Sequence, residues 1–172
     1  TVIQAGDVVN IDVSAVLEGF WGDTGASTML APTKPKIEKL FKVTQEALYA
    51  GIAQARAGKP LFHVGKAIYS IAKRNRLTVL KQLNGHGVGR HIHEDPTVFN
   101  FYSRQNRLKL RDGLVMTVEP FFSLGRRDSI YTDTDDGWTL RTLDHAISAQ
   151  FEHTVVINGD EPLLVTKVDG SH

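Results

Sequence analysis

The sequence contains no cysteine among its 172 residues, which excludes disulfide bonds and thiolate metal ligands. This absence is typical of proteins in a reducing compartment, and we expect a cytoplasmic location. No apolar run approaches the roughly 20 residues that a membrane-spanning helix needs. We therefore expect neither a signal peptide nor a membrane partner.

The sequence also lacks a strong excess of charge. Its 20 Lys and Arg and 19 Asp and Glu give a formal net charge of +1, and no run of basic residues exceeds a pair. These features give no indication of nucleic-acid binding, and we expect no DNA partner. The hydrophobic share of 41% is ordinary for a globular protein, and we expect one domain over residues 1–172.

Hydrophobic patterning predicts strands, then helices, then strands. Alternation over 8–17 indicates a half-buried strand, Glu18-Gly19 a tight turn and 20–30 a returning strand. Apolar residues at helical spacing predict helices over about 36–56 and 61–75. Further strands are predicted at 77–83, 114–122, 138–143, 149–157 and 163–168. This order is typical of an α+β domain with helices on one face of a mainly antiparallel sheet.

The most distinctive stretch runs from Gly85 to Pro96 and holds three of the seven histidines: His86, His91 and His93. Its glycines favour a loop that a ligand or a metal can approach closely. The same stretch is equally compatible with a surface turn that titrates near neutral pH and has no function. The acidic residues elsewhere in the chain decide between these interpretations.

Two aspartates fall on one face of the predicted hairpin. If Glu18-Gly19 forms the turn, Ser14 pairs with Asp23. Asp12 then opposes Gly25, so the two aspartates are diagonal neighbours, about 7–8 Å apart at the backbone. Like charges on one sheet face are unfavourable unless a cation lies between them, and a pair of divalent cations would fit there. The alternative is a solvated face whose acids bind nothing.

Two glutamates lie in apolar strands further along the chain. Glu119 ends an apolar run just before Pro120, where ladder pairing must stop. Alternation places Gln150, Glu152 and Thr154 on one side of a later strand. Buried carboxylates need a metal or hydrogen-bonding partners, so the alternative is a pair of satisfied sheet acids.

Together these residues form a candidate metal-binding set of one imidazole and four carboxylates. Such donors suit Mn, Fe, Co or Zn, and two dications would balance the four negative charges. Metals held this way would lower the pKa of a water molecule and polarise a carbonyl group. The candidate ligands are Asp12, Asp23, His86, Glu119 and Glu152.

The chain resembles the type I methionine aminopeptidases in motifs that occur in the family's order over essentially all 172 residues. The interval between His93 and Glu119 leaves no room for the helical insertion of the type II enzymes. Prolidases and aminopeptidases P share the ligand set, but the later motifs look like those of the methionine enzymes. The matching stretches are Gly6–Asp12, Gly22–Thr24, Gly85–Gly89, His93–Pro96, Val118–Pro120, Trp138-Thr139 and Ser148–Thr154.

This resemblance implies the pita-bread (creatinase/aminopeptidase-like) fold, with helices on the outer face of an antiparallel sheet. It implies a dinuclear-metal aminopeptidase that removes the initiator methionine from peptides and nascent proteins, with the ribosome as a candidate place of action. The cofactors would be two divalent ions of Co, Mn, Fe or Zn. The resemblance also implies that the N-terminal part of the family's fold is absent here.

The family's roles carry over residue by residue. Asp12 would bind one metal and His86 the other, while Asp23 and Glu152 would bridge the two. Glu119 would bind beside His86 and handle the proton of the attacking water. The substrate contacts implied are His93 at the substrate carbonyl or amide, and Trp138 and Ile92 at the methionine pocket.

Because the chain departs from the family's pattern in two ways, other functions are also possible interpretations of the sequence. Ile92 replaces a common Phe, which alters the pocket wall. The absent N-terminal part normally supplies strands, helices, much of the pocket and another catalytic histidine, so weakened activity and an uncovered sheet edge are expected. The alternatives are a pita-bread protein that only binds a partner, and a metallopeptidase directed at Xaa-Pro bonds.

Overall fold

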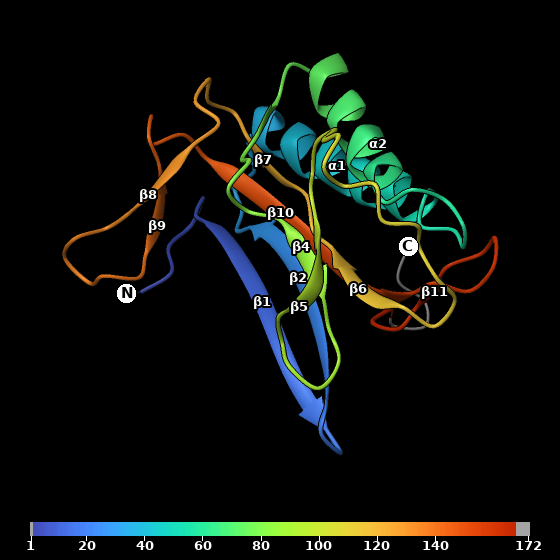
Figure 1. Cartoon of the computed structure of the whole chain (residues 1–172). Coiled ribbons are helices and arrows are strands. Elements are labelled where there is room, and N and C mark those ends of the chain that lie inside the picture. Colours follow the sequence, from blue (N-terminus) through green and yellow to red (C-terminus); the bar gives the residue numbers. More distant parts are fainter. Residues whose placement is uncertain (1, 168–172) are drawn as a thin grey trace.

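The computed structural model describes residues 2–167 as a curved antiparallel sheet with helices α1 and α2 packed on one side (Figure 1). Within these residues the main sheet has nine strands, with β1-β2-β10-β6-β4-β5 as its principal order. The expected α+β architecture is confirmed. No helix in the described part of the chain is both long and apolar enough to cross a bilayer.

The first hairpin forms with the predicted register. Strands β1 (Val8–Leu17) and β2 (Phe20–Met29) pair Ser14 with Asp23 and Asp12 with Gly25. The turn between them uses positive φ angles at both of its residues, which suits the right-handed twist of a hairpin.

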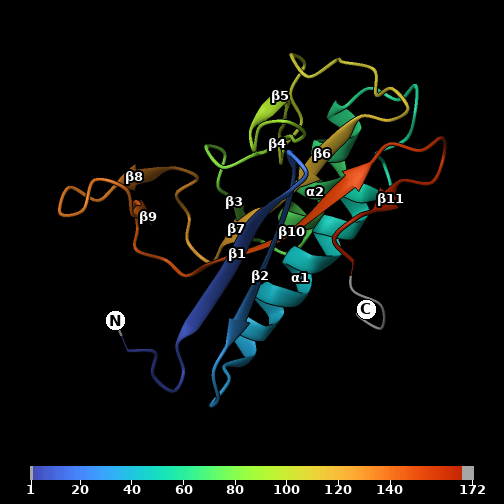
Figure 2. The ribbon, with the colours of Figure 1, turned by 90° about the horizontal axis from the view of Figure 1, so that it is seen from below.

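One expectation for β1 is wrong. The strand was expected to bury its apolar side, yet Ile11 is 60% exposed and Val13 is 50% exposed. β1 lies at the edge of the sheet, and no described segment covers its apolar side (Figure 2). Asp12 is also exposed, but it lies on the other side of the strand, where it lines a cavity.

The helices cover the centre of the sheet. α1 (Pro35–Ile52) and α2 (Phe62–Arg74) match the expected positions, although α1 ends four residues before Arg56. Apolar residues of both helices pack against β6, β7 and β10 in one core. Its largest fully buried side chains include Leu40, Leu48, Ile68, Met116 and Phe122.

Strand β10 (Ser148–Val156) is the middle of the sheet. It pairs with β2 on one side and, on the other, with β6 (Val115–Val118) and then β7 (Phe121–Ser123). Glu119 and Pro120 fall in the break between β6 and β7, as the missing N–H of proline predicts.

The His- and Gly-rich stretch is more regular than the expected loop. Its ends form β4 (Gly85–Gly87) and β5 (Glu94–Val98), which pair with each other, and β4 also pairs with β6. Gly87 permits this close pairing, because a Cβ there would overlap the backbone of Asp95.

The remaining strands are short. β3 (Thr78–Val79) is all that forms of the strand expected at 77–83, and β11 (Leu163–Leu164) is shorter than expected, with residue 168 outside the described residues. β8 (Ile130–Thr132) and β9 (Leu140–Thr142) form a separate hairpin arm around an acidic turn at 133–137. This arm projects from the body of the molecule (Figure 2).

Candidate metal centre

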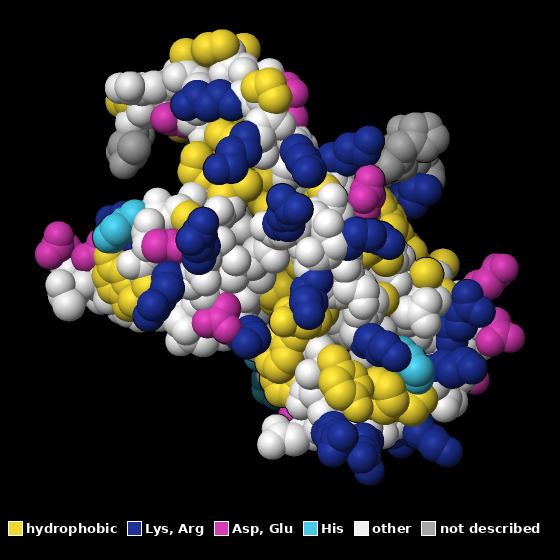
Figure 3. Space-filling model, turned by 90° about the horizontal axis from the view of Figure 1, so that it is seen from above, with side chains coloured by type: hydrophobic (Ala, Val, Ile, Leu, Met, Phe, Trp, Pro, Cys, Tyr) yellow, Lys and Arg dark blue, Asp and Glu magenta, His cyan; other side chains and the backbone are white. Residues whose placement is uncertain are grey.

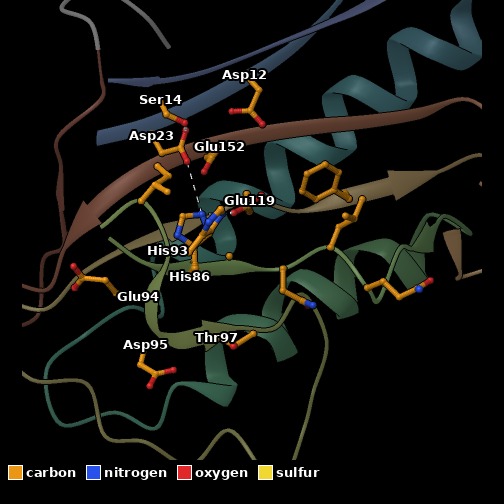
Figure 4. Close-up of a pocket in the computed structure, with 16 residues that line it drawn as sticks. Asp12, Ser14, Asp23, His86, His93, Glu94, Asp95, Thr97, Glu119 and Glu152 are labelled. Carbon is orange, nitrogen blue, oxygen red and sulfur yellow. Dashed lines mark hydrogen bonds and ion pairs between the residues drawn. The ribbon is translucent and has the colours of Figure 1, made fainter. Parts of the chain in front are cut away.

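A cavity of about 830 Å³ opens on the side of the sheet opposite the helices. All five candidate ligands line it, and Figure 4 shows their side chains converging from β1, β2, β4, β10 and the end of β6. The structure therefore brings together residues that are up to 140 positions apart in the sequence, from Asp12 to Glu152.

Strand register explains this convergence. Asp12 lies across from Gly25, and Gly25 lies across from Glu152. The pairs that flank the break between β6 and β7 set Glu119 across from Glu152. One row of neighbouring positions, across β1, β2, β10 and the break after β6, therefore carries three of the four carboxylates on the same face.

A second polar row runs beside the first. Asp23 receives a hydrogen bond from the Ser14 hydroxyl at 3.0 Å, and the Thr154 hydroxyl donates to the Asp23 carbonyl at 2.7 Å. Thr154 in turn lies across from Thr117 on β6. The second row thus supplies the fourth carboxylate and three hydroxyl groups that hold it and its neighbours in place.

Gly25 leaves space in the middle of the first row. A Cβ at this position would overlap the amide of Gln150. That amide donates to Glu152 Oε2 at 2.9 Å and to Asp12 Oδ2 at 3.3 Å. A single buried side chain therefore orients two of the candidate ligands.

His86 presents one nitrogen to the carboxylates. Its Nδ1 lies 3.0 Å from the carbonyl oxygen of Gly87, which can only accept, so Nδ1 carries the proton. Nε2 is then unprotonated in the neutral ring and lies 3.4 Å from Glu119 Oε1 and 3.8 Å from Asp23 Oδ2. The free lone pair therefore points into the cluster of acids, as metal coordination requires.

Thr117 connects two candidate ligands. Its hydroxyl accepts the backbone N–H of His86 at 3.0 Å and donates to Glu119 Oε1 at 2.9 Å. The side chain is fully buried, so no water replaces either contact. Thr117 fixes the loop histidine and the strand glutamate relative to each other.

The chemistry and spacing of these donors fit divalent cations. Donor atoms of Asp23, His86 and Glu152 all lie within 4.8 Å of one another. Two ligand atoms that share a cation at about 2.1 Å each lie no more than about 4.2 Å apart, so small shifts suffice. Glu152 Oε1 is buried and has no hydrogen-bond partner among the described residues, which leaves a lone pair available for a metal.

The electrostatics of the cluster also favour a cation. Burial raises the pKa of Glu119 to about 8, and the charges of Asp12 and Asp23 add to the effect. Burial raises the pKa of Glu152 to about 10, again with help from neighbouring carboxylates. Burial lowers the pKa of His86, which keeps the ring in the neutral form that binds metals. Without a cation, ionising these buried carboxylates costs free energy. A bound dication would stabilise their ionised forms.

The predicted substrate residues are placed differently from one another. His93 and Ile92 line the cavity, and the His93 ring stands edge-on to His86 with the centroids 4.3 Å apart. Trp138 is 77% exposed on the β8–β9 arm and is not among the residues that line the cavity. Its assignment to the methionine pocket stays a prediction.

Sequence reasoning did not name Thr117 or Gln150 as parts of the site. A signal was available, because each lies two residues before a candidate ligand on a strand and so shares its face. His91 was given no role, and its exposed side chain lies outside the cavity lining.

Comparison with known proteins gives a consistent picture. Residues 1–159 match metallopeptidase family M24. Methionine aminopeptidase 2 of Bacillus subtilis (strain 168) is 40% identical over 97% of this chain and 67% of its own length. Methionine aminopeptidase of Escherichia coli (strain K12) is 39% identical over 97% of this chain and 63% of its own length.

Solved structures agree with the sequence relatives. The methionine aminopeptidase of Rickettsia prowazekii superposes with a TM-score of 0.91 at 36% identity, covering 96% of this chain and 66% of that one. The prolidase of Pyrococcus furiosus, with a TM-score of 0.76 at 21% identity over 97% of this chain and 43% of that one, shares the fold. The chain spans about two thirds of the length of the methionine aminopeptidases it matches.

Proposed function

Since this chain belongs to metallopeptidase family M24, and within it to the methionine aminopeptidases, we propose that it removes N-terminal methionine from peptides and nascent proteins. The observation that carries the proposal is the convergence of one imidazole and four carboxylates in a single cavity. Relatives of the same name are 40% identical over nearly the whole chain.

Two divalent ions of Co, Mn, Fe or Zn would be held by the candidate ligands. Asp12 would hold one ion, His86 and Glu119 the other, and Asp23 and Glu152 would lie between them. Bound dications supply Lewis acidity to a carbonyl group and lower the pKa of a nearby water. Two observations support this assignment: Glu152 Oε1 has no hydrogen-bond partner among the described residues, and Nε2 of the neutral His86 ring carries a lone pair.

Glu119 would act as the proton acceptor and donor. In the metal-free protein, burial and the charges of Asp12 and Asp23 raise the pKa of Glu119 to about 8, so its carboxyl group holds a proton readily near neutral pH. The hydrogen bond from Thr117 to Oε1 leaves Oε2 to exchange a proton with the attacking water. His93, exposed at the rim of the cavity, would donate a hydrogen bond to the substrate carbonyl and stabilise the tetrahedral intermediate.

The cavity is large enough for a short peptide. Its volume of about 830 Å³ exceeds what a methionine side chain needs, and Ile92 and Phe121 supply apolar wall near the acids. We further propose that residues 1–172 act as one catalytic domain, in the cytoplasm, on chains that emerge from the ribosome. Trp138 would contribute to the methionine pocket if the β8–β9 arm lies over a bound substrate.

A peptide assay with metal analysis tests the proposal. The purified chain, reconstituted with Co²⁺ or Mn²⁺, should release methionine from Met-Ala-Xaa peptides. Glu119→Gln keeps the size of the side chain and the acceptor for Thr117 but cannot exchange the proton, so turnover should fall by about 10²–10⁴. Because Glu119 is also a proposed ligand, turnover is compared at equal bound metal. Glu46→Gln, an exposed change on α1, is the matched control and should have full activity.

Metal content separates this proposal from its alternatives. Asp23→Ala should lower the bound metal measured by mass spectrometry. The proposal fails if no metal-dependent methionine release occurs and Asp23→Ala leaves the metal content unchanged. Metal retention without turnover would instead indicate a binding protein, and faster cleavage of Xaa-Pro peptides would indicate a prolidase-like enzyme.

A further inference from the structure

Asn100 is a fully buried polar side chain that does not line the cavity. It lies just after β5, and its exposed fraction is 0%. Burying an amide costs free energy unless its polar atoms find partners. Asn100 Oδ1 is buried and has no hydrogen-bond partner among the described residues, so the amide is only half satisfied. The contacts of its nitrogen must therefore explain why an amide lies at this place in the interior.

The amide nitrogen of Asn100 joins two backbone segments. Nδ2 lies 3.0 Å from the carbonyl oxygen of Glu119 and 3.0 Å from the carbonyl oxygen of Leu83. An amide nitrogen carries two hydrogens, so it can donate one to each carbonyl. An amide turned the other way would place an oxygen against both carbonyl oxygens. The two contacts thus fix the orientation of the side chain.

The carbonyl of Glu119 needs this donor because the sheet is interrupted there. β6 ends at Val118 and β7 begins at Phe121, and the intervening Pro120 has no N–H to donate. A buried carbonyl without a donor costs free energy. Asn100 therefore supplies, from a side chain, the hydrogen bond that strand pairing does not supply at the break.

The carbonyl of Leu83 lies at the start of the segment that carries His86. Leu83 precedes His86 by three residues, and β4 begins between them. Asn100 thus connects the backbones that bear two candidate ligands, His86 and Glu119, whose Nε2 and Oε1 atoms are 3.4 Å apart. The Thr117 hydroxyl connects the same two segments at a second point.

Helix α2 holds the backbone at Asn100 from the other side. The outer face of the helices is rich in Lys and Arg (Figure 3), whereas the inner side of α2 is buried and includes Gly65. A Cβ at Gly65 would overlap the carbonyl oxygens of Phe99 and Phe101, the two neighbours of Asn100. Because such close packing leaves little room for movement, α2 fixes the point from which Asn100 holds the two ligand segments.

We propose that Asn100 is a positioning residue, which sets the separation of His86 and Glu119 through their backbones. The inference rests on the proposed function, since these two ligands would share one ion of that site. Two donor atoms that share a cation at about 2.1 Å each lie no more than about 4.2 Å apart, so a small shift of either segment weakens the ion. The ion at Asp12 has no such link to Asn100.

Co²⁺ binding to Asn100→Leu tests the proposal. Leucine branches at the same carbon but has no donor, so both carbonyls lose their hydrogen bond and the unpartnered Oδ1 is removed. In chelator competition followed by Co²⁺ absorption, the affinity for one of the two ions should fall by about 10–100-fold, whereas the affinity for the other should stay within about twofold. At saturating Co²⁺, kcat for Met-Ala-Xaa peptides should fall about tenfold or more at unchanged KM.

Asn106→Leu is the matched control. Asn106 is 8% exposed, and its Nδ2 donates to the carbonyl of Thr97 at 3.0 Å, not to a ligand segment. Its variant should bind both ions as the parent does. Urea denaturation with a chelator shows whether each variant is folded. If Asn100→Leu does not fold, Asn100→Ser, which has one hydrogen for two carbonyls, should show the same loss at one ion.

Three results would overturn the inference: parent-like affinity for both ions in the folded Asn100 variant, equal losses at both ions, or the same loss in Asn106→Leu. Methionine release by the parent is measured on the same samples. A parent that releases methionine beside Asn100 variants with unchanged metal binding contradicts this inference alone. A parent that binds no Co²⁺ and releases no methionine contradicts the proposed function, and the inference falls with it.

Discussion

The two faces of the sheet carry opposite kinds of side chain although the same strands supply both. On β10, Glu152 lines the cavity and Gln150 donates a hydrogen bond to it from the same side, whereas Phe151 and His153 contact Phe41 and Tyr49 of α1. Packing of apolar groups holds the helix face together, and hydrogen bonds hold the acids of the cavity face in place. Because alternate residues of a strand point to opposite faces, one set of side chains stabilises the core and the other forms the candidate metal centre. A substitution can therefore change the stability without changing the proposed chemistry, or the reverse.

The largest expected effect is a penalty that the cavity face imposes on the metal-free protein. Because burial raises the pKa of Glu119 to about 8 and of Glu152 to about 10, the folded protein keeps protons that the unfolded chain loses. The free energy of unfolding should therefore fall by a few kcal/mol between about pH 6.5 and about pH 8.5. Urea denaturation in the presence of a chelator measures this change.

Histidines set the lower limit of that pH window. Burial lowers the pKa of His86 and His153, so their contribution to stability is gained as the pH rises to the ordinary histidine range of about 6.5 and is constant above it. The free energy of unfolding should change little over this window in the double variant Glu119→Gln, Glu152→Gln. The same should hold for the parent protein with saturating Mn²⁺. A metal-free parent whose stability is flat or rising over this window would contradict the prediction.

Much of the cavity face could be predicted from the sequence, and the reason is local. The Glu18-Gly19 turn fixed the register of the first hairpin, and the two-residue period of strands fixed which side chains share a face with Glu152. Pro120 marked the place where β6 must stop. Turn chemistry, period and proline are all properties of neighbouring residues, so they can be inferred without the fold.

The features that could not be predicted depend on long-range packing or on summation over a surface. Whether the apolar side of β1 is covered depends on what packs over it, and alternation at Ile11 and Val13 carries no such information. The link from Thr117 to His86 joins segments 31 residues apart. The excess of Lys and Arg over residues 34–76 was missed because net charge averages over the whole chain, although a count over those residues would have found it.

A smaller effect should separate two buried threonines, one on each side of the sheet. Thr117→Val removes the hydroxyl that holds His86 and Glu119, and metal affinity should fall by about 10–100-fold. Thr44→Val removes a hydroxyl that donates to the Leu40 carbonyl within α1, so metal affinity should not change. Chelator competition measures both, and equal affinities for the two variants would show that Thr117 does not position the ligands.

The smallest expected effect concerns the arm that belongs to neither face. Trp138 is 77% exposed, so Trp138→Ala should change the free energy of unfolding by no more than about 0.5 kcal/mol. If the arm contributes to the methionine pocket, the variant should raise KM for Met-Ala peptides and leave kcat nearly unchanged, because only substrate binding is lost. Leu140→Ala, on β9 of the same arm and 51% exposed, controls for general effects on the hairpin and should leave KM unchanged. An unchanged KM in Trp138→Ala would remove Trp138 from the pocket and leave Ile92 and Phe121 as its apolar wall.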